Sequence, residues 1–408
     1  MSASATSTSA DPTPAVLARL ADLAPDQLPA YLYDLPALRR HAAAVRAALP
    51  ERVELYYAAK ANPEPALLTA LRDLVDGYEV SSGGELAHVR AAAPGAALAF
   101  GGPGKTPAEL AAALRAGVHR WHLESVQELR QLAALTAAAP GATVDVLLRV
   151  NPPLATGLPD SAALAMGGRP TPFGLDPRAT EECLRLLARP EAARLRLRGL
   201  HAHLASGLAP AEHLAIAEQV LDWSAALAAR HRLELTEVNL GGGMAVDYTA
   251  PAARFDWAAL GTGLRHLLAR HPGLRLRIEP GRALTAYCGW YATEVLDVRR
   301  SHGEQFAVLR GGTHHLRTPA TRGHSQPFDV LPVPAWPHPW PRPTATAAPI
   351  TLAGQLCTPK DVLAHHATAP GLRAGDRVVF QLAGAYAWNI SHHEFLLHPR
   401  PTFHVLDE

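Results

Sequence analysis

Lys60 is the residue of this sequence that most directly suggests covalent chemistry. It lies in the segment YYAAKAN, residues 56–62, directly after an apolar run with the composition of a buried strand. A lysine at such a strand end is partly removed from water, which lowers the pKa of its ammonium and favours imine formation. Considered alone, a lysine in this position is more often a solvated side chain.

Two glycine-containing segments follow later apolar runs. The triplet Gly241, Gly242 and Gly243 lets backbone N–H groups approach an anion such as a phosphate, although its spacing is not that of a dinucleotide-binding loop. A plain flexible loop is the alternative reading. The segment IEPGR places Glu279 at a strand end and Arg282 three residues later, which supplies one carboxylate and one guanidinium suited to phosphate. A buried glutamate is costly, so Glu279 is expected to meet a cation or to be protonated.

The segment HAHLAS adds His203 and Ser206 after another apolar run. A histidine here is more often a hydrogen-bonded core residue. Taken together, however, the set contains a lysine for an imine, glycines and an arginine for a phosphate, and a carboxylate for a ring nitrogen. Pyridoxal phosphate requires these groups. The sequence therefore predicts this cofactor, attached to Lys60.

The elements that must position these residues form a repeating pattern. Short β-type runs alternate with longer Ala/Leu/Arg helical segments, as in a parallel sheet built from βα units. Eight such units predict a closed (β/α)₈ barrel over residues 37–285, with its site at the carboxyl ends of the strands. The expected strands are residues 53–59, 78–81, 97–100, 119–123, 143–150, 197–204, 236–240 and 274–279.

Residues 286–408 are β-rich with Pro- and Gly-rich loops, which predicts a second, all-β domain. Residues 29–36 contain the run AYLYDL, which is expected to be either a strand that joins this domain or an ordinary lead-in strand. Residues 1–28 are predicted to be a disordered tail, because the opening segment has neither a basic start nor an apolar core. The fold class is therefore α/β, a barrel followed by a β domain.

The composition excludes several classes of function. The formal net charge of +1 gives no basic excess for nucleic acid or an anionic membrane surface, and no apolar run is long enough to cross a bilayer. The three cysteines are an odd number at wide spacing, so neither a disulfide framework nor a paired metal site is expected. These features predict a cytoplasmic enzyme without a metal.

The sequence resembles the alanine-racemase-fold decarboxylases, which include ornithine and diaminopimelate decarboxylases, over residues 29–405. The segments YYAAKAN, YEVSSGGEL, HAHLASG, GQLCTPKD and GAY carry the resemblance. It implies that Lys60 holds pyridoxal phosphate, that His203 stacks on its ring and that Glu279 pairs with the ring nitrogen. It also implies a homodimer with shared active sites, in which Cys357 protonates the substrate carbon after CO₂ loss. The other residues it assigns to the cofactor are Ser206, Gly241, Gly242, Gly243, Gly281, Arg282 and Tyr386.

Two positions depart from the family pattern. Thr358 replaces the acid that engages the distal ammonium of ornithine or diaminopimelate, so neither substrate is favoured. Ala205 replaces a usual glycine and is expected to change little. The histidine-rich segments 311–328 and 384–399 are more similar to the siderophore-biosynthesis branch, whose substrates are amino acids condensed with citrate or a similar polycarboxylate. The residues expected to meet such a substrate are Arg317, His314, His315, His324, Thr358, Asp361, His392 and His393.

Several alternatives remain open at this point. A decarboxylase of a free amino acid or an amino-acid racemase would use the same cofactor geometry, and a non-catalytic cofactor-binding regulator is a third possibility. A zinc site formed by the paired histidines is a further alternative, although no ligand spacing supports it. Because strand alternation points neighbouring side chains to opposite faces, about half of these histidines are expected to face the site.

Overall fold

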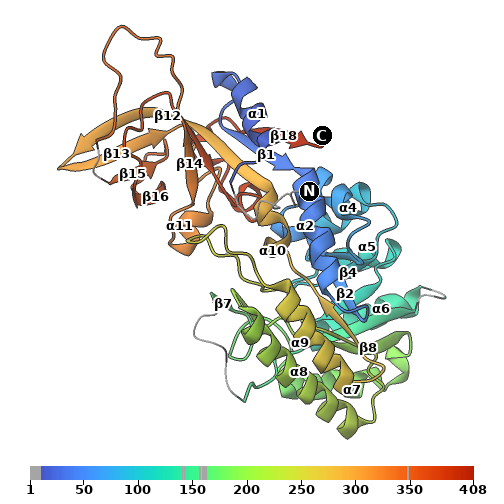
Figure 1. Ribbon diagram of the computed structural model, residues 1–408. Coiled ribbons are helices and arrows are strands. Elements are labelled where there is room, and N and C mark those ends of the chain that lie inside the picture. The colour runs from blue at the N-terminus through green and yellow to red at the C-terminus, as the bar shows by residue number, and fades with distance from the viewer. Residues whose placement is uncertain (1–10, 140, 142, 156–157, 159–162, 347–348) are drawn as a thin grey trace. The chain divides into compact units, whose positions relative to one another are not determined.

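The computed structural model describes residues 11–139, 141, 143–155, 158, 163–346 and 349–408 (Figure 1). It divides into two compact units. The barrel unit contains Arg39–Ala245 and Phe255–Leu284, and the sheet unit contains the chain up to Leu38, Val246–Arg254 and Thr285–Glu408.

The barrel unit is a closed barrel of eight parallel strands, which confirms the predicted fold class. Every strand run expected from the sequence is a barrel strand. Each strand is hydrogen-bonded in parallel to both neighbours, in the order β10-β11-β2-β3-β4-β5-β6-β8. The strands are β2 (Val53–Ala58), β3 (Gly77–Val80), β4 (Leu98–Phe100), β5 (Arg120–Leu123), β6 (Val144–Arg149), β8 (Leu195–His201), β10 (Glu237–Asn239) and β11 (Arg275–Ile278).

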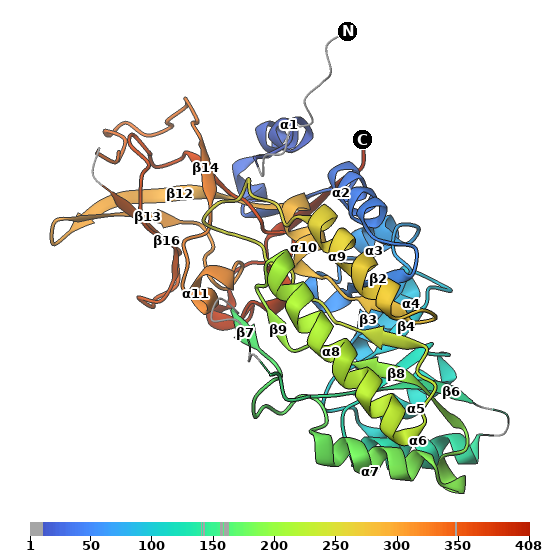
Figure 2. The same ribbon diagram turned by 60° about the horizontal axis from the view of Figure 1, so that its bottom comes forward.

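Helices connect the barrel strands, and three of them begin at a hydroxyl residue soon after a strand. Ser82, Thr106 and Ser125 each accept a hydrogen bond from the backbone N–H three residues on, which satisfies a donor at the helix start. Helices α8 and α9 lie side by side in both views (Figures 1 and 2). The helices are α2 (Leu35–Ala48), α3 (Pro65–Leu71), α4 (Gly83–Ala92), α5 (Pro107–Arg115), α6 (Val126–Ala138), α7 (Pro177–Leu187), α8 (Pro210–His231), α9 (Trp257–Arg270) and α10 (Arg282–Thr285).

Ion pairs fill the amino end of the barrel interior. The buried guanidinium of Arg277 bonds Glu54 and Glu237, and Arg120 bonds Glu237 from the other side. Each carboxylate stands at or next to the first residue of its strand. These charges pair with one another at the amino ends of the strands, opposite to the end at which a barrel site is expected.

The sheet unit contains one eight-stranded sheet. Six strands follow the order β14-β17-β12-β13-β15-β16, and β1 pairs with both β12 and β18. The N-terminal strand β1 thus belongs to this sheet. The unit also contains the short helix α11 (Thr318–Arg322). The strands are β1 (Ala30–Asp34), β12 (Gly289–Ser301), β13 (Glu304–Leu309), β14 (Phe328–Leu331), β15 (Ile350–Ala353), β16 (Val362–Ala367), β17 (Arg377–Phe380) and β18 (Thr402–Leu406).

The prediction of a disordered tail over residues 1–28 is wrong from Pro14 onward; residues 1–10 lie outside the described part of the chain. Helix α1 (Pro14–Asp22) begins with Thr13 as its N-cap and buries Val16 and Leu20. These side chains pack with Leu23, Leu28 and the strand residues Leu32, Trp290 and Val379. Burial of this apolar face offsets the conformational entropy that such a short segment loses on ordering.

Candidate active site

Lys60 lies in the short 3-10 helix η2 (Ala59–Ala61), directly after β2. Its Nζ donates to Glu79 Oε2 at 2.8 Å, and Ser81 Oγ donates to Glu79 Oε1 at 2.7 Å. Burial alone would raise the pKa of Glu79, but the charge and hydrogen bond of Lys60 outweigh it, so the net pKa is lowered. An ionised, buried Glu79 therefore holds the amine of Lys60, whose side chain is 42% exposed. The sequence analysis missed Glu79, although an acid inside the apolar run YEVS was a visible signal.

Glu279 ends the run that begins with β11 and is buried. Its Oε1 accepts a hydrogen bond from Asn239 Nδ2 at 2.6 Å. Burial, followed by the negative charge of Glu79, raises the pKa of Glu279 to about 7. Of the two outcomes expected from the sequence, a cation or a proton, the second is therefore favoured below neutrality.

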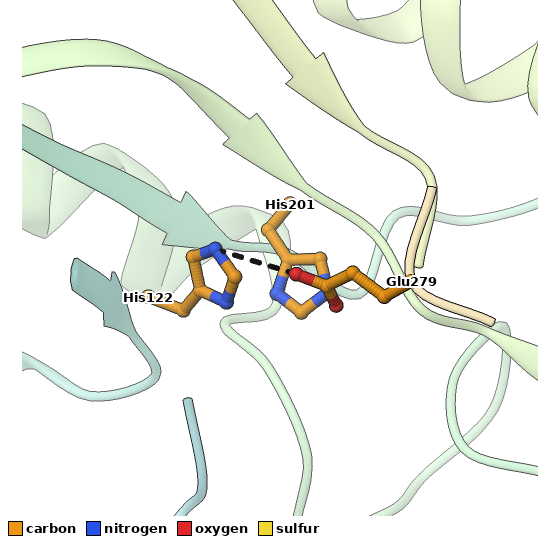
Figure 3. A group of neighbouring side chains, drawn as sticks. All are labelled: His122, His201 and Glu279. Carbon is orange, nitrogen blue, oxygen red and sulfur yellow. Dashed lines mark ion pairs between the residues drawn. The ribbon is translucent and has the colours of Figure 1, made fainter. Parts of the chain in front are cut away.

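Two histidines lie against Glu279 (Figure 3). His122 on β5 has its Nε2 3.9 Å from Oε1, and His201 on β8 has its Nε2 3.5 Å from Oε2. Their ring centroids are 4.2 Å apart. Burial first, and then neighbouring cations, keep the pKa of each ring well below its usual value, so both imidazoles are neutral. The sequence analysis missed both, since a histidine inside an apolar strand resembles a core residue.

The ligand atoms of His122, His201 and Glu279 all lie within 4.8 Å of one another, so this group could hold a metal ion. Asn239 opposes that use. Its amide donates to Glu279 Oε1 and lies 3.3 Å from His122 Nε2, so it competes with a metal for these two atoms. We therefore interpret the group as a hydrogen-bonded cluster around an acid.

The glycine triplet corrects one prediction. The sequence assigned all three glycines to a phosphate, but the Gly241 N–H is donated to Asn239 Oδ1 and the Gly242 N–H to His203 Nδ1. Gly241 has φ +68°, and a Cβ there would lie 2.5 Å from the Cβ of His203. Gly241 is required because the chain after β8 approaches closely, and Gly242 because a Cβ there would lie 2.4 Å from the carbonyl oxygen of Glu279, after β11. Their amides orient Asn239 and His203.

The remaining cofactor candidates of the barrel unit follow the carboxyl ends of β8 and β11. Ser206 is in the two-residue strand β9 (Ala205–Ser206), which pairs with β7 (Leu164–Ala165). Gly281 packs against the lysine turn, because a Cβ there would lie 2.7 Å from the Cβ of Ala61. Arg282 follows as the first residue of α10. The ends of the first and eighth barrel strands are thus in contact, as the backbone bond from Ala58 N to Pro280 O also shows.

An open pocket of about 610 Å³ lies at the carboxyl ends of β5 and β6. Glu124, Asn151, Arg169 and Thr171 are among its lining residues. Glu124 pairs with Arg149 at 2.7 Å, whereas Arg169 and Asp176, which also line the pocket, are exposed. The pocket thus has room and a cationic side chain for the far part of a substrate.

In the sheet unit, Cys357 is an exposed free thiol and Thr358 is half-buried beside it. The sequence placed Asp361 among the substrate-contacting residues, and the structure corrects this. Asp361 is 2% exposed, and its two carboxylate oxygens accept from the backbone N–H groups of Thr313 and Leu356. It ties the cysteine loop to the loop at residue 313 and has no free oxygen facing solvent.

The candidate histidines of the sheet unit do not form one set. His314 and His315 are buried with ring centroids 4.0 Å apart, and His392 and His393 lie near enough to lower the pKa of His314. His324 instead contacts Tyr248, with the two rings tilted by 40° and their centroids 4.4 Å apart. Burial lowers the pKa of His314 to about 4 and of His315 to about 3, so these two are neutral and could act as donors but not as cations. Within the described chain His315 contacts Tyr291 and Pro399 O, and His314 has no hydrogen-bond partner.

Two further candidates lie close to these histidines in the chain. Arg317 is exposed, and its backbone N–H bonds Ser391 Oγ. Tyr386 is half-buried with φ +48°, an uncommon backbone conformation for a bulky residue, and Thr318 Oγ1 donates to its carbonyl oxygen. Backbone strain of this kind clusters at functional sites, which keeps Tyr386 a candidate.

Comparisons with known proteins agree with this geometry. Residues 35–286 match the family model of the pyridoxal-dependent decarboxylase, pyridoxal binding domain. A Staphylococcus aureus protein, 2-((L-alanin-3-ylcarbamoyl)methyl)-2-hydroxybutanedioate decarboxylase, is 38% identical over 382 residues, 93% of this chain and 94% of that protein. The chain belongs to the pyridoxal-dependent decarboxylase family. It is an enzyme of the decarboxylase class, as its sequence predicted.

Other members of the family are more distant. A diaminopimelate decarboxylase of Actinosynnema pretiosum is 33% identical over 369 residues, 88% of this chain and 79% of that protein. The crystal structure of diaminopimelate decarboxylase from Helicobacter pylori complexed with L-lysine has a TM-score of 0.81 at 22% identity, with 96% and 94% of the two chains covered. This likeness supports the barrel-plus-sheet fold.

In the part of the chain that the structure describes, no helix has the length and apolar character to span a bilayer.

The residues present fit a pyridoxal ring. Within the described chain, both ring nitrogens of His201 and Nδ1 of His122 are buried without a hydrogen-bond partner. Such orphaned polar atoms beside a lysine and a buried acid are expected where a polar ring completes the site.

Proposed function

We propose that this chain decarboxylates an amino-acid-type substrate with pyridoxal phosphate bound through Lys60, and that the far end of the substrate carries carboxylates. A diamino acid or alanine derivative conjugated with citrate or a similar polycarboxylate, as used in siderophore biosynthesis, fits this description. The observation that carries the proposal is the pairing of Lys60 with Glu79 near a buried Glu279 of raised pKa.

When bound, pyridoxal phosphate supplies an electron sink for the electron pair left at Cα when a carboxylate departs as CO₂. Lys60 Nζ would hold the cofactor covalently and, once released, would be oriented by Glu79. Glu279 would hold a proton at the ring nitrogen, and His203 would lie against the ring. Ser206, Gly243, Gly281 and Arg282 remain the proposed phosphate contacts, because the amides of Gly241 and Gly242 have partners inside the protein.

We further propose a homodimer in which Cys357 donates a proton at Cα and Tyr386 contacts the cofactor. Two features of the sheet unit support this. The thiol of Cys357 is exposed on a loop held by Asp361, and Phe395, Leu396 and Leu397 are exposed apolar side chains, with Leu397 79% exposed, of the kind that a subunit interface covers. The three cysteines are free thiols, which supports a reducing, cytoplasmic location.

The substrate proposal rests on charge and space. The relative from Staphylococcus aureus acts on a hydroxybutanedioate derivative, and Thr358 offers no acid for a distal ammonium. Arg169 beside the 610 Å³ pocket, and the exposed Arg317, are guanidinium groups suited to carboxylates. Neutral His314 and His315, together with His324, His392 and His393, are proposed as hydrogen-bond donors to the same groups.

The deciding experiment measures CO₂ from the protein with pyridoxal phosphate and a panel of substrates: citryl-diamino acids, lysine, ornithine and diaminopimelate. We expect turnover with the citryl conjugates and none in Lys60→Ala. Preferential turnover of a free diamino acid would overturn the substrate, and proton exchange at Cα without CO₂ would indicate a racemase. Cofactor binding without turnover of any member of the panel would favour the regulatory alternative.

A further inference from the structure

Asn239 joins the glycine turn to Glu279. Its carboxamide oxygen Oδ1 accepts a hydrogen bond from the Gly241 N–H at 2.9 Å. A backbone N–H can only donate, so the oxygen and not the nitrogen of the amide faces Gly241. The Nδ2 group therefore points into the barrel, where it lies 2.6 Å from Glu279 Oε1 and 3.3 Å from His122 Nε2.

This orientation fixes the tautomer of His122. An amide nitrogen has two N–H groups and no lone pair to offer, so His122 Nε2 must be the acceptor and the ring proton lies on Nδ1. A protonated His122 would bring two N–H groups face to face. The same ring is buried, and the cations around it, Arg277, Lys105, Arg149 and Lys60, further oppose its protonation.

Glu279 is balanced between two protonation states by its surroundings. Burial and the charge of Glu79 favour the protonated acid, whereas the Asn239 hydrogen bond and the charges of Lys60 and Arg277 favour the carboxylate. A carboxylate that accepts an N–H is stabilised relative to the acid. Asn239, which donates to Oε1, can therefore decide which form is present near neutral pH.

We propose that Asn239 and His122 act as one positioning unit that keeps Glu279 a hydrogen-bond acceptor for the ring nitrogen of the cofactor. The Gly241 amide sets the direction of Asn239, Asn239 gives one N–H to Glu279, and neutral His122 takes the other N–H and so holds the amide in place. This inference rests on the proposed function, because it assumes that the ring nitrogen meets Glu279.

The test compares the dissociation constants of pyridoxal phosphate and of its 1-deaza analogue, which has C–H in place of the ring nitrogen. The full-length protein is first stripped of cofactor. Because only pyridoxal phosphate can form a charge-assisted hydrogen bond with Glu279, we expect it to bind the wild type about tenfold more tightly than the analogue. Asn239→Asp should reduce this ratio by roughly fivefold or more, since two adjacent carboxylates force one of them to take a proton.

Gln305→Glu is the matched control. The buried Gln305 amide also accepts from a backbone N–H, that of Thr346, and it lies on β13 of the sheet unit. We expect an unchanged ratio in this variant. Normal binding with an unchanged ratio in Asn239→Asp would overturn the inference and leave the proposed function intact. Absence of a Lys60-dependent visible absorbance in the wild type would instead refute the cofactor assignment.

If Asn239→Asp does not fold, two variants of His122 test the same inference. His122→Phe keeps a ring against His201 but removes the acceptor Nε2, and we expect the ratio to fall roughly threefold because the amide loses one of its fixed partners. His122→Gln restores an oxygen acceptor and should recover most of the wild-type ratio. An unchanged ratio in a folded His122→Phe protein would exclude a role for this ring, and failure of His122→Gln to recover would show that only ring packing matters.

Discussion

The two buried histidine pairs of this enzyme share one property and differ in another. His122 and His201 in the barrel unit, and His314 and His315 in the sheet unit, are all neutral because burial opposes their protonation. In the barrel the pair lies against the carboxylate of Glu279. In the sheet unit His315 lies against Tyr291 and a backbone carbonyl instead.

The presence of an acid beside only one of the two pairs implies that the pairs have different roles. Burial alone makes an imidazole neutral, and a neutral imidazole can pack in an interior at modest cost. Only the barrel pair shares its space with an acid whose own pKa is raised to about 7. The buried pair of the sheet unit is therefore expected to affect stability and, through hydrogen bonds, substrate binding, whereas the pair in the barrel is expected to affect the chemistry at the cofactor.

The largest effect should come from removing the acid. Glu279→Gln keeps the size of the side chain and a partner for Asn239, but an amide cannot hold a proton at the ring nitrogen. We expect kcat to fall on the order of 10²–10³-fold, similar to the loss of one preorganised electrostatic group. Glu294→Gln, the same change at a glutamate paired with Arg310 in the sheet unit, should leave kcat within about twofold, because a partly exposed pair contributes little. Similar losses of kcat in the two variants would contradict the contrast between the barrel unit and the sheet unit.

The second prediction concerns the loss of stability at acidic pH that the buried histidines of the sheet unit cause. The folded-state pKa values of His314 and His315, about 4 and about 3, lie below their unfolded value of 6.5. The unfolded chain therefore binds more protons below pH 6.5, and stability is lost as the pH falls. Urea unfolding of the apoprotein between pH 7.5 and 5.5 should show a loss of about 3 kcal/mol for the pair. His314→Leu removes one titrating group that has no hydrogen-bond partner in the described chain and should halve the slope; an unaltered slope would show that other groups titrate.

The third prediction concerns Glu279 in the barrel unit, whose contribution to stability is lost as the pH rises rather than as it falls. The folded-state pKa of Glu279, about 7, lies above its unfolded value of 4.5. The stability that Glu279 contributes to the folded state is fully present below pH 4.5 and is lost as the pH rises through 7. The apoprotein should lose about 2 kcal/mol between pH 5 and 7 through this group. The difference in unfolding free energy between wild type and Glu279→Gln should follow this curve, and a difference independent of pH would contradict the raised pKa.

The sequence predicted the groups that stand at strand ends and missed those inside strands. Lys60 and Glu279 follow apolar runs, and the carboxyl ends of parallel strands meet at one edge, so both could be placed without coordinates. His122, His201 and Asn239 reach Glu279 only through the register of strands that are distant in sequence, which single runs do not encode. The same limit applies to β1, whose pairing with β12 and β18 depends on partners more than 250 residues away.

The smallest effect compares two glycines with nearly the same backbone. Gly241 has φ +68° and Gly323 has φ +66°, but a Cβ at Gly241 would contact His203, whereas a Cβ at Gly323 meets nothing within 4 Å. Both alanine variants should lose about 1 kcal/mol of stability, because alanine is disfavoured in the left-handed backbone conformation. Gly241→Ala should lose about 1 kcal/mol more, because His203 must move, and it alone should weaken cofactor binding, several-fold. Thermal unfolding and cofactor titration of the two variants separate these costs. Equal behaviour would mean that the close approach at Gly241 relaxes freely, and that the glycine is required there for its backbone alone.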